Sequence, residues 1–317
     1  MKYIYLDLNS WINLHMREED DDLRRKIERA VADGDVAIPL IHTLLREEAT
    51  FENEEMRSSM FNYMFDLSKT HCLRTFEDVR YFEVERFVYM IQGIDWDLNE
   101  VVRGQGVGHM FGNWTLTVDG EALSREDYPD LYDKIERLMV EKPGFDIATD
   151  VAVDLARNQE SWEQELHEEV IEITEEWDEK FHDNARRRRY AIFKHFQQSV
   201  FPELMREMIR QNTFHDFSHY DFEKYVKQGD EEVNALFQLF PATYSYIMLT
   251  NARDLQDGRK PNDVYDLFSL GLAIPYTDVV VTEKFWSHEA SRAGLDERYS
   301  TDVLSSLDEI PDAVDAL

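Results

Sequence analysis

The chain opens on a strand that ends in a carboxylate. Residues 3–6 form an unbroken run of large side chains, and Asp7 follows directly. Such a run is too short for a helix and is typical of a strand buried on both faces at the middle of a parallel sheet. The carboxyl ends of the central strands open onto the ligand crevice in doubly wound sheets, so Asp7 is expected there. The plain alternative is that Asp7 only caps a helix beginning near Ser10.

A β-α-β unit is predicted next. Residues 11–31 carry apolar side chains at helical spacing, and a turn at residues 33–35 leads into a second apolar strand at residues 36–40. A crossover of this kind is right-handed and its strands are parallel. The helix that starts at Thr43 then places Glu47, or Glu48 as the rival choice, at the same edge of the sheet as Asp7.

A further buried strand is predicted late in the chain, at the β-branched run of residues 279–282. Asp263 and Asp266 lie three apart on one face of the preceding helix, and Asp278 stands just before the strand. We therefore expect an α/β fold with a parallel, Rossmann-like three-layer core built from residues 1–55 and 240–317. Residues 56–239 are expected to form a large, mainly helical insertion packed on that core.

Composition narrows the class of protein. The 317 residues include 66 Asp and Glu against 34 Lys and Arg, a formal net charge of −32, and this balance resembles that of proteins from halophilic archaea. Acidity this general is an adaptation to salt and does not exclude a nucleic-acid partner. The single cysteine, Cys72, excludes an internal disulfide and a cysteine-based zinc cluster. No apolar run is long enough for a membrane span and no signal peptide is recognisable, so a cytoplasmic protein is expected.

A basic run stands out against this background. It consists of four consecutive arginines, Arg186, Arg187, Arg188 and Arg189. They are candidates for holding an RNA phosphate backbone, and equally for pairing with the acidic residues at 175–179. The sequence leaves both readings open.

Carboxylates gathered at one end of a parallel sheet repel one another, and a divalent cation relieves that repulsion. A ligand set of oxygen atoms without Cys or His suits Mg²⁺ or Mn²⁺. Such a site supports metal-assisted hydrolysis of a phosphodiester.

The same residues resemble the PIN domain, a family of metal-dependent ribonucleases. The resemblance lies in the opening strand with Asp7 and Asn9, an acid in the helix after the second strand, and acids at the helix and strand near residues 263–282. It implies an endoribonuclease whose metal ligands are Asp7, Glu47, Asp263 or Asp266, and Asp278, with Asn9 as a positioning neighbour. Of the two α-helical acids, Asp263 is expected to matter more than Asp266, because it lies at the helix start nearest the strand ends. RNA would be the substrate, and an antitoxin or other protein partner and a homodimer stay open.

Two other functions compete with the nuclease. One is a catalytically inactive PIN-like module that binds RNA or protein, with the acids serving as helix caps and salt-adapted surface. The other is a haloacid-dehalogenase-like phosphatase, which also begins with a strand ending in Asp. That enzyme needs a second Asp two residues on, where this chain has Asn9.

The charge balance generates a first prediction. Screening extends over about 3 Å at molar salt but about 10 Å at 0.1 M, so self-repulsion grows as salt is removed. The melting temperature measured by circular dichroism should therefore fall as KCl is lowered from molar to below a few hundred millimolar. A melting temperature that is the same at both ends of the range would contradict the salt-adapted interpretation.

Overall fold

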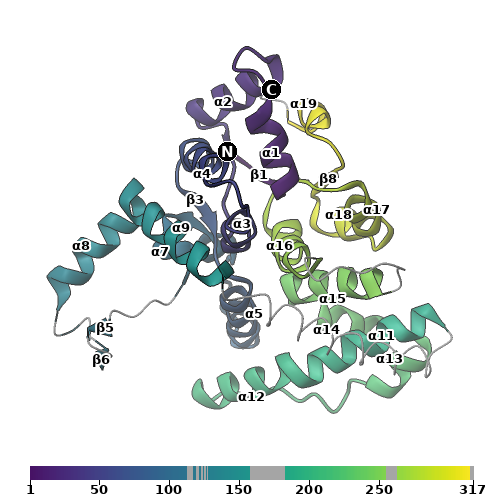
Figure 1. The fold of residues 1–317 in the computed structure, drawn as a ribbon. Coiled ribbons are helices and arrows are strands. Elements are labelled where there is room, and N and C mark those ends of the chain that lie inside the picture. The colour runs from purple at the N-terminus through teal and green to yellow at the C-terminus, as the bar shows by residue number, and fades with distance from the viewer. Residues whose placement is uncertain are drawn as a thin grey trace.

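The protein is a mostly helical α/β chain built around a four-stranded parallel sheet (Figure 1). The structure, a computed structural model, describes residues 1–112, 117–118, 121–122, 124, 126, 128–157, 183–254 and 263–314. The sheet order is β2-β1-β7-β8, so the first strand of the chain lies inside the sheet, as its sequence predicts. Its strands are β1 (Lys2–Leu6), β2 (Val36–Ala37), β7 (Val279–Val281) and β8 (Asp302–Leu304).

Parallel pairing fixes the register of the two central strands. In β1 and β7, Ile4 lies opposite Val279 and Leu6 opposite Val281. On the outer sides, β2 pairs with β1 and β8 pairs with β7, both in parallel. All four strands therefore point the same way, and their carboxyl ends share one edge.

A separate two-stranded sheet lies alongside the residues that follow β2. Leu40 forms an isolated parallel bridge with Cys72 in β3 (His71–Leu73), in which Leu40 N donates to His71 O at 2.9 Å. The same strand pairs in antiparallel fashion with β4 (Arg103–Gln105). Part of the segment expected as an insertion thus lies alongside residues 36–40, and the proposed domain boundaries at 55/56 and 239/240 stay predictions.

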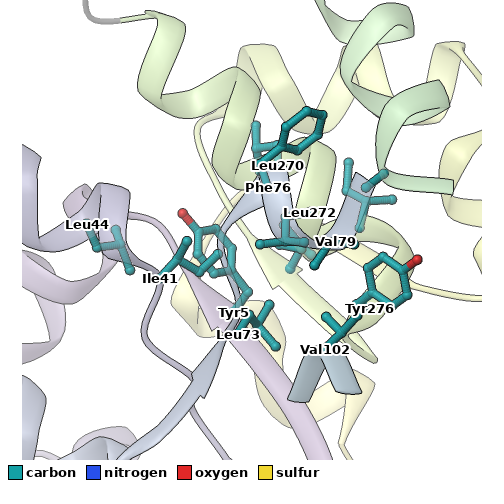
Figure 2. Close-up of a cluster of buried hydrophobic side chains, with 14 of the residues drawn as sticks. Tyr5, Ile41, Leu44, Leu73, Phe76, Val79, Val102, Leu270, Leu272 and Tyr276 are labelled. Carbon is teal, nitrogen blue, oxygen red and sulfur yellow. The ribbon is translucent and has the colours of Figure 1, made fainter. Parts of the chain in front are cut away.

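The strands are held by apolar burial on both faces. Leu6, Val280 and Val281 have no exposed surface, and Tyr5 is 2% exposed. Figure 2 shows Tyr5 among side chains from several elements, including Ile41, Leu44 and Leu270. Burying a side chain of this size contributes about 1.5–3 kcal/mol, so the short strands gain their stability from packing more than from their few ladder hydrogen bonds.

Helices cover the sheet and extend away from it. Helices α15 and α16 pack against each other, and α11, α12, α13 and α14 lie together at the lower end of the view beside α15 (Figure 1). The α-helices are α1 (Leu8–Met16), α2 (Asp22–Asp33), α3 (His42–Glu48), α4 (Glu54–Ser68), α5 (Phe76–Ile91), α6 (Asn99–Val102), α7 (Val107–Met110), α8 (Pro129–Val140), α9 (Lys142–Arg157), α11 (Asn184–His195), α12 (Phe201–Arg210), α13 (Phe222–Gln228), α14 (Glu231–Phe237), α15 (Pro241–Asp254), α16 (Asp263–Tyr276), α17 (Lys284–Arg292), α18 (Leu295–Tyr299) and α19 (Ile310–Ala313). A π-helix, η1 (Phe196–Val200), joins α11 to α12, and a 3₁₀ turn, η2 (Leu307–Glu309), precedes α19. Strands β5 (Thr117–Val118) and β6 (Glu121–Ala122) form a separate antiparallel pair.

The single helix predicted over residues 11–31 is wrong. The structure has two helices, because α1 ends at Met16 and the side chain of Asp21 caps α2 by accepting from Arg24 N at 3.0 Å. Asp21 belongs to an acidic run at residues 18–22, so this run supplies the cap. Gly34 then ends α2 in the left-handed conformation, at φ +79°, which only glycine adopts without steric cost.

A buried carboxylate fastens α15 and α16 to α5. Glu83 of α5 has no exposed surface and accepts from Ala242 N at 2.5 Å and from the Tyr276 hydroxyl at 2.9 Å. Thr243 donates to the second oxygen through its hydroxyl at 3.1 Å. A buried carboxyl group thus accepts from the amino end of α15, where the N–H groups lack partners within the helix; burial raises its pKa to about 7, against the effect of these hydrogen bonds.

The acids at 175–179, the alternative partners of the arginine run, lie outside the described residues. Every helix that the structure does describe is too short or too polar to cross a lipid bilayer.

The Glu83 contacts predict a clear stability difference. Glu83→Ala should lower the free energy of unfolding by about 3 kcal/mol or more, because several buried donors lose their acceptor at about 1–3 kcal/mol each. Glu83→Gln keeps one carbonyl acceptor and should lose less. Urea denaturation measures both.

The matched control is Glu203→Ala. Glu203 pairs with Arg80 at 3.0 Å near the surface, where an ion pair contributes about 1 kcal/mol or less. An equal loss in Glu83→Ala and Glu203→Ala would show that Glu83 does not fasten these helices.

Candidate acidic site at the carboxyl edge of the sheet

The order of the strands creates a topological switch point between β1 and β7, and we call the carboxyl edge of the sheet at this point the crevice. The chain leaves β1 for β2 on one side of the sheet and later returns to β7 on the other side. The connections from neighbouring strands therefore diverge at this point, which is where open α/β sheets bind ligands. Asp7 directly follows β1, and Thr282 and Glu283 directly follow β7.

Asp7 lies at the base of this crevice. Its N–H donates to Val281 O at 3.0 Å, which extends the ladder by one residue, and the residue is 5% exposed. One carboxylate oxygen accepts from Ser10 N at 2.7 Å, so Asp7 also caps α1. Burial raises the pKa of Asp7, and Glu283 raises it further, against the opposing effect of the Ser10 and Thr282 groups. Asp7 thus stands in the crevice and caps a helix at once.

Two helices bring carboxylates to the same place. Burial, then the charges of Asp7 and Glu283, raise the pKa of Glu47 in α3 to about 7. The pKa of Asp266, in the first turn of α16, is raised well above its usual range by burial and then by Glu47, against a hydrogen bond from Trp286 Nε1 at 3.1 Å. Three elements far apart in the sequence therefore share one negative environment.

Glu283 and Asn9 form the exposed rim of the site. Asn9 Nδ2 donates to Glu283 Oε1 at 2.6 Å. Both residues are exposed, whereas Asp7 beneath them is buried. We call Asp7, Glu47, Asp266 and Glu283 the acidic cluster. Glu283 was not among the predicted site residues, although it follows a buried strand as closely as Asp7 does.

Asp278 does not belong to the acidic cluster, contrary to expectation. One of its carboxylate oxygens accepts from Tyr3 N at 2.7 Å, and its own N–H donates to Tyr3 O at 2.8 Å. It precedes β7, so it stands at the amino edge of the sheet, whereas Glu283 follows β7 five residues later, a span of about 16 Å in extended chain. The physical reason is direction: a residue before a parallel strand and a residue after its neighbour lie at opposite edges.

The surroundings also differ within each pair of alternative residues, Asp263 and Asp266 in α16 and Glu47 and Glu48 in α3. Asp266 is the α16 acid that shares the environment of the cluster, because burial and then the charges of Glu47, Asp7 and Glu283 raise its pKa. Asp263 is the first residue of that helix. Glu48 is fully buried beside Glu47, and burial and the Glu47 charge raise its pKa to about 8, with Arg57 opposing. Its neighbours thus place Glu48 on the Arg57 side of α3, next to the cluster.

The arginine run does not form one exposed basic surface. Arg187 is 1% exposed, so it does not reach solvent. Arg189 donates to the carbonyls of Val226 and Lys227, both at 3.3 Å, and thereby caps the end of α13. Arg188 is half-buried, and Arg186 is the exposed member. Two of the four predicted RNA contacts therefore have structural roles.

As placed in the described part of the chain, no three His, Cys, Asp or Glu side chains converge closely enough to hold a metal ion. The donor chemistry of the acidic cluster nevertheless fits a hard cation, since it consists of carboxylates alone with an amide at the rim. Comparison of the chain with protein-family models, curated proteins and solved structures finds no match.

The raised pKa values predict how stability depends on pH. The folded chain holds protons on Glu47 and Glu48 that the unfolded chain releases above pH 4.5. With EDTA present, the free energy of unfolding should therefore fall as pH rises from 5 to 8, by at most about 1.4 kcal/mol per pH unit for each such proton. Urea denaturation at four pH values measures the slope.

Glu47→Gln should flatten this slope, because glutamine takes up no proton. The exposed loop residue Glu18 provides the control, since Glu18→Gln should leave the slope unchanged. A free energy of unfolding that rises from pH 5 to 8 in the metal-free protein would contradict the shared negative environment.

Proposed function

We propose that the chain is a divalent-metal-dependent ribonuclease of the PIN-like kind, with the acidic cluster as its site. The observation that carries the proposal is the meeting of Asp7, Glu47, Asp266 and Glu283 at the switch point between β1 and β7. In the described residues, Lys and Arg are absent from the groups that most shift the pKa of Asp7, Glu47 and Asp266. A cation is the partner that this arrangement requires.

The chemistry of the donors favours Mg²⁺ or Mn²⁺. Both ions take oxygen ligands and retain bound waters and substrate phosphates. Asp7, Glu47, Asp266 and Glu283 would hold the ion, whose contribution is to activate a water and to neutralise charge on a phosphodiester.

Other side chains would orient the acidic cluster and attract the RNA backbone. Ser10 and Thr282 orient Asp7 at the base of the crevice, and Asn9 orients Glu283 at the rim. Lys284 is exposed at the first position of α17, next to Glu283. Its ammonium group adds positive charge at the rim, where the phosphate backbone of a single-stranded RNA would approach.

The fold supports the PIN-like part of the proposal at a coarse level. It is an α/β fold with a parallel sheet whose first strand is central and delivers Asp7 to the crevice. The acid after the second strand and the acid in the helix before β7 stand at that same edge, in the order that the resemblance implies.

A second candidate is an inactive module that binds RNA or protein. The specific observation in its favour is that Asp7 already caps α1 through Ser10 N. In that case the cluster would be a remnant whose charge costs stability, and metal would neither stabilise the chain nor promote cleavage.

Matched amide substitutions test the proposal. In molar KCl with Mn²⁺, Asp266→Asn and Glu283→Gln should each slow cleavage of a single-stranded RNA by roughly a hundredfold or more, since losing several kcal/mol of transition-state stabilisation costs tenfold per 1.4 kcal/mol. Asp278→Asn and Asp263→Asn should retain most of the wild-type rate. Gel analysis of end-labelled RNA gives the rates.

Thermal melts of the same variants provide the check on folding. Mn²⁺ at a hundredfold excess over its Kd should stabilise the wild-type chain by about 2.7 kcal/mol, and Asp278→Asn should keep this gain while Asp266→Asn loses it. A wild-type chain that neither cleaves RNA nor responds to Mn²⁺ would favour the inactive module. Loss of activity in Asp278→Asn equal to that in Asp266→Asn would remove the cluster from the mechanism.

A further inference from the structure

Two buried hydroxyl groups join the helices that carry Glu47 and Asp266. Thr43 Oγ1 of α3 and Ser269 Oγ of α16 are 2.6 Å apart, and both residues are 3% exposed. Burial raises the pKa of Tyr5 in β1, and the neighbouring Ser269 hydroxyl opposes this rise. Hydroxyl groups thus lie close together on the same three elements that supply Asp7, Glu47 and Asp266.

Each of the three hydroxyl-bearing residues shares a face of its helix or strand with a carboxylate of the cluster. Thr43 and Glu47 are four apart on α3, and Ser269 and Asp266 are three apart on α16, so each pair shares a helix face. Tyr5 and Asp7 are two apart on the strand, so they share a face of the sheet. A layer of hydroxyls therefore underlies a layer of carboxylates in matching positions.

The Tyr5 side chain shows how close the two layers are. Burial raises its pKa, and the charges of Asp7, Asp266 and Glu47 all contribute. In Figure 2 its hydroxyl oxygen points away from Leu73, on the opposite end of the ring from the β1 backbone. The hydroxyl thus stays neutral and remains a donor beneath the carboxylates.

Hydroxyl pairs suit this position because each group can donate and accept at once. A hydrogen bond between α3 and α16 holds the two helices at a fixed separation, which apolar packing alone specifies less sharply. Groups that orient metal ligands in this indirect way typically affect metal affinity by 10–100-fold.

We propose that Thr43, Ser269 and Tyr5 form a positioning layer that fixes the spacing of Asp7, Glu47 and Asp266 and thereby sets the affinity of the site for a divalent cation. This inference rests on the proposed function. None of the three hydroxyls needs to touch the ion or the RNA, so they are positioning residues and not ligands.

A pair of substitutions at one position separates the hydroxyl from the shape of the side chain. Thr43→Val replaces the hydroxyl by a methyl group of similar size, whereas Thr43→Ser keeps the hydroxyl and removes the methyl. Calorimetric titration of the full chain with Mn²⁺ alone should show about tenfold weaker binding for Thr43→Val and nearly wild-type binding for Thr43→Ser.

The control for a merely structural hydroxyl is Thr301. It is also 3% exposed, and its hydroxyl lies 2.6 Å from Ile274 O at the amino edge of the sheet, away from the cluster. Thr301→Val should lower the melting temperature but leave the Kd for Mn²⁺ unchanged. Equal Mn²⁺ affinity in Thr43→Val and the wild type, or equal weakening in Thr43→Val and Thr301→Val, would overturn the proposal.

A metal-free measurement keeps the layer testable if the wild-type chain does not bind Mn²⁺. That result would defeat the proposed function, and the layer would then be judged by hydrogen exchange of the peptides that cover α3 and the first turn of α16. Faster exchange of both peptides in Thr43→Val, but not in Thr43→Ser, supports the layer. Unchanged exchange in Thr43→Val refutes it.

Discussion

The parallel register between β1 and β7 is the constraint on which the rest of the structure depends. It pairs residues at the two ends of the chain, with Leu6 opposite Val281, and so brings Asp7 and Glu283 to one edge. A shift of one residue would turn the side chains of the strand to the other face and bury charge in the core. The pairing is held because Leu6 and Val281 are fully buried, so the same apolar contacts that stabilise the sheet also place the carboxylates.

This placement carries an energetic cost. Partly buried carboxylates that share one environment resist ionisation, which is why the pKa of Glu47 rises to about 7 and that of Asp266 rises further. The hydroxyl contact between Thr43 and Ser269 lies immediately below and joins the two helices that bear these acids. The fold therefore holds together groups that would separate if the helices were free, as is common where proteins sacrifice stability for a functional site.

Much of the framework could be predicted from short-range pattern. The apolar runs at residues 3–6, 36–40 and 279–282 predicted strands where the structure has β1, β2 and β7, although β2 covers only Val36–Ala37 and β7 ends at Val281. Strand direction correctly put Asp7 at the carboxyl edge. The same rule of strand direction excludes Asp278, which precedes β7, and selects Glu283, which follows it. The wrong prediction of Asp278 was therefore avoidable from the sequence. The choice of Asp266 over Asp263, the burial of Arg187 and the contact of β3 with Leu40 depend on tertiary packing, which sequence periodicity does not encode.

The general acidity of the chain and the acidic cluster are separate physical effects. Exposed carboxylates interact through water and are screened by salt within a few ångströms at molar ionic strength. Asp7 is 5% exposed and lies in a less polar environment, where mobile ions screen it much less. High salt therefore relieves the repulsion between surface charges, and a polyanion such as RNA can approach the chain. The repulsion within the acidic cluster remains at high salt, and it is relieved by protonation of the raised-pKa acids Glu47 and Asp266 or, under the proposed function, by a bound cation.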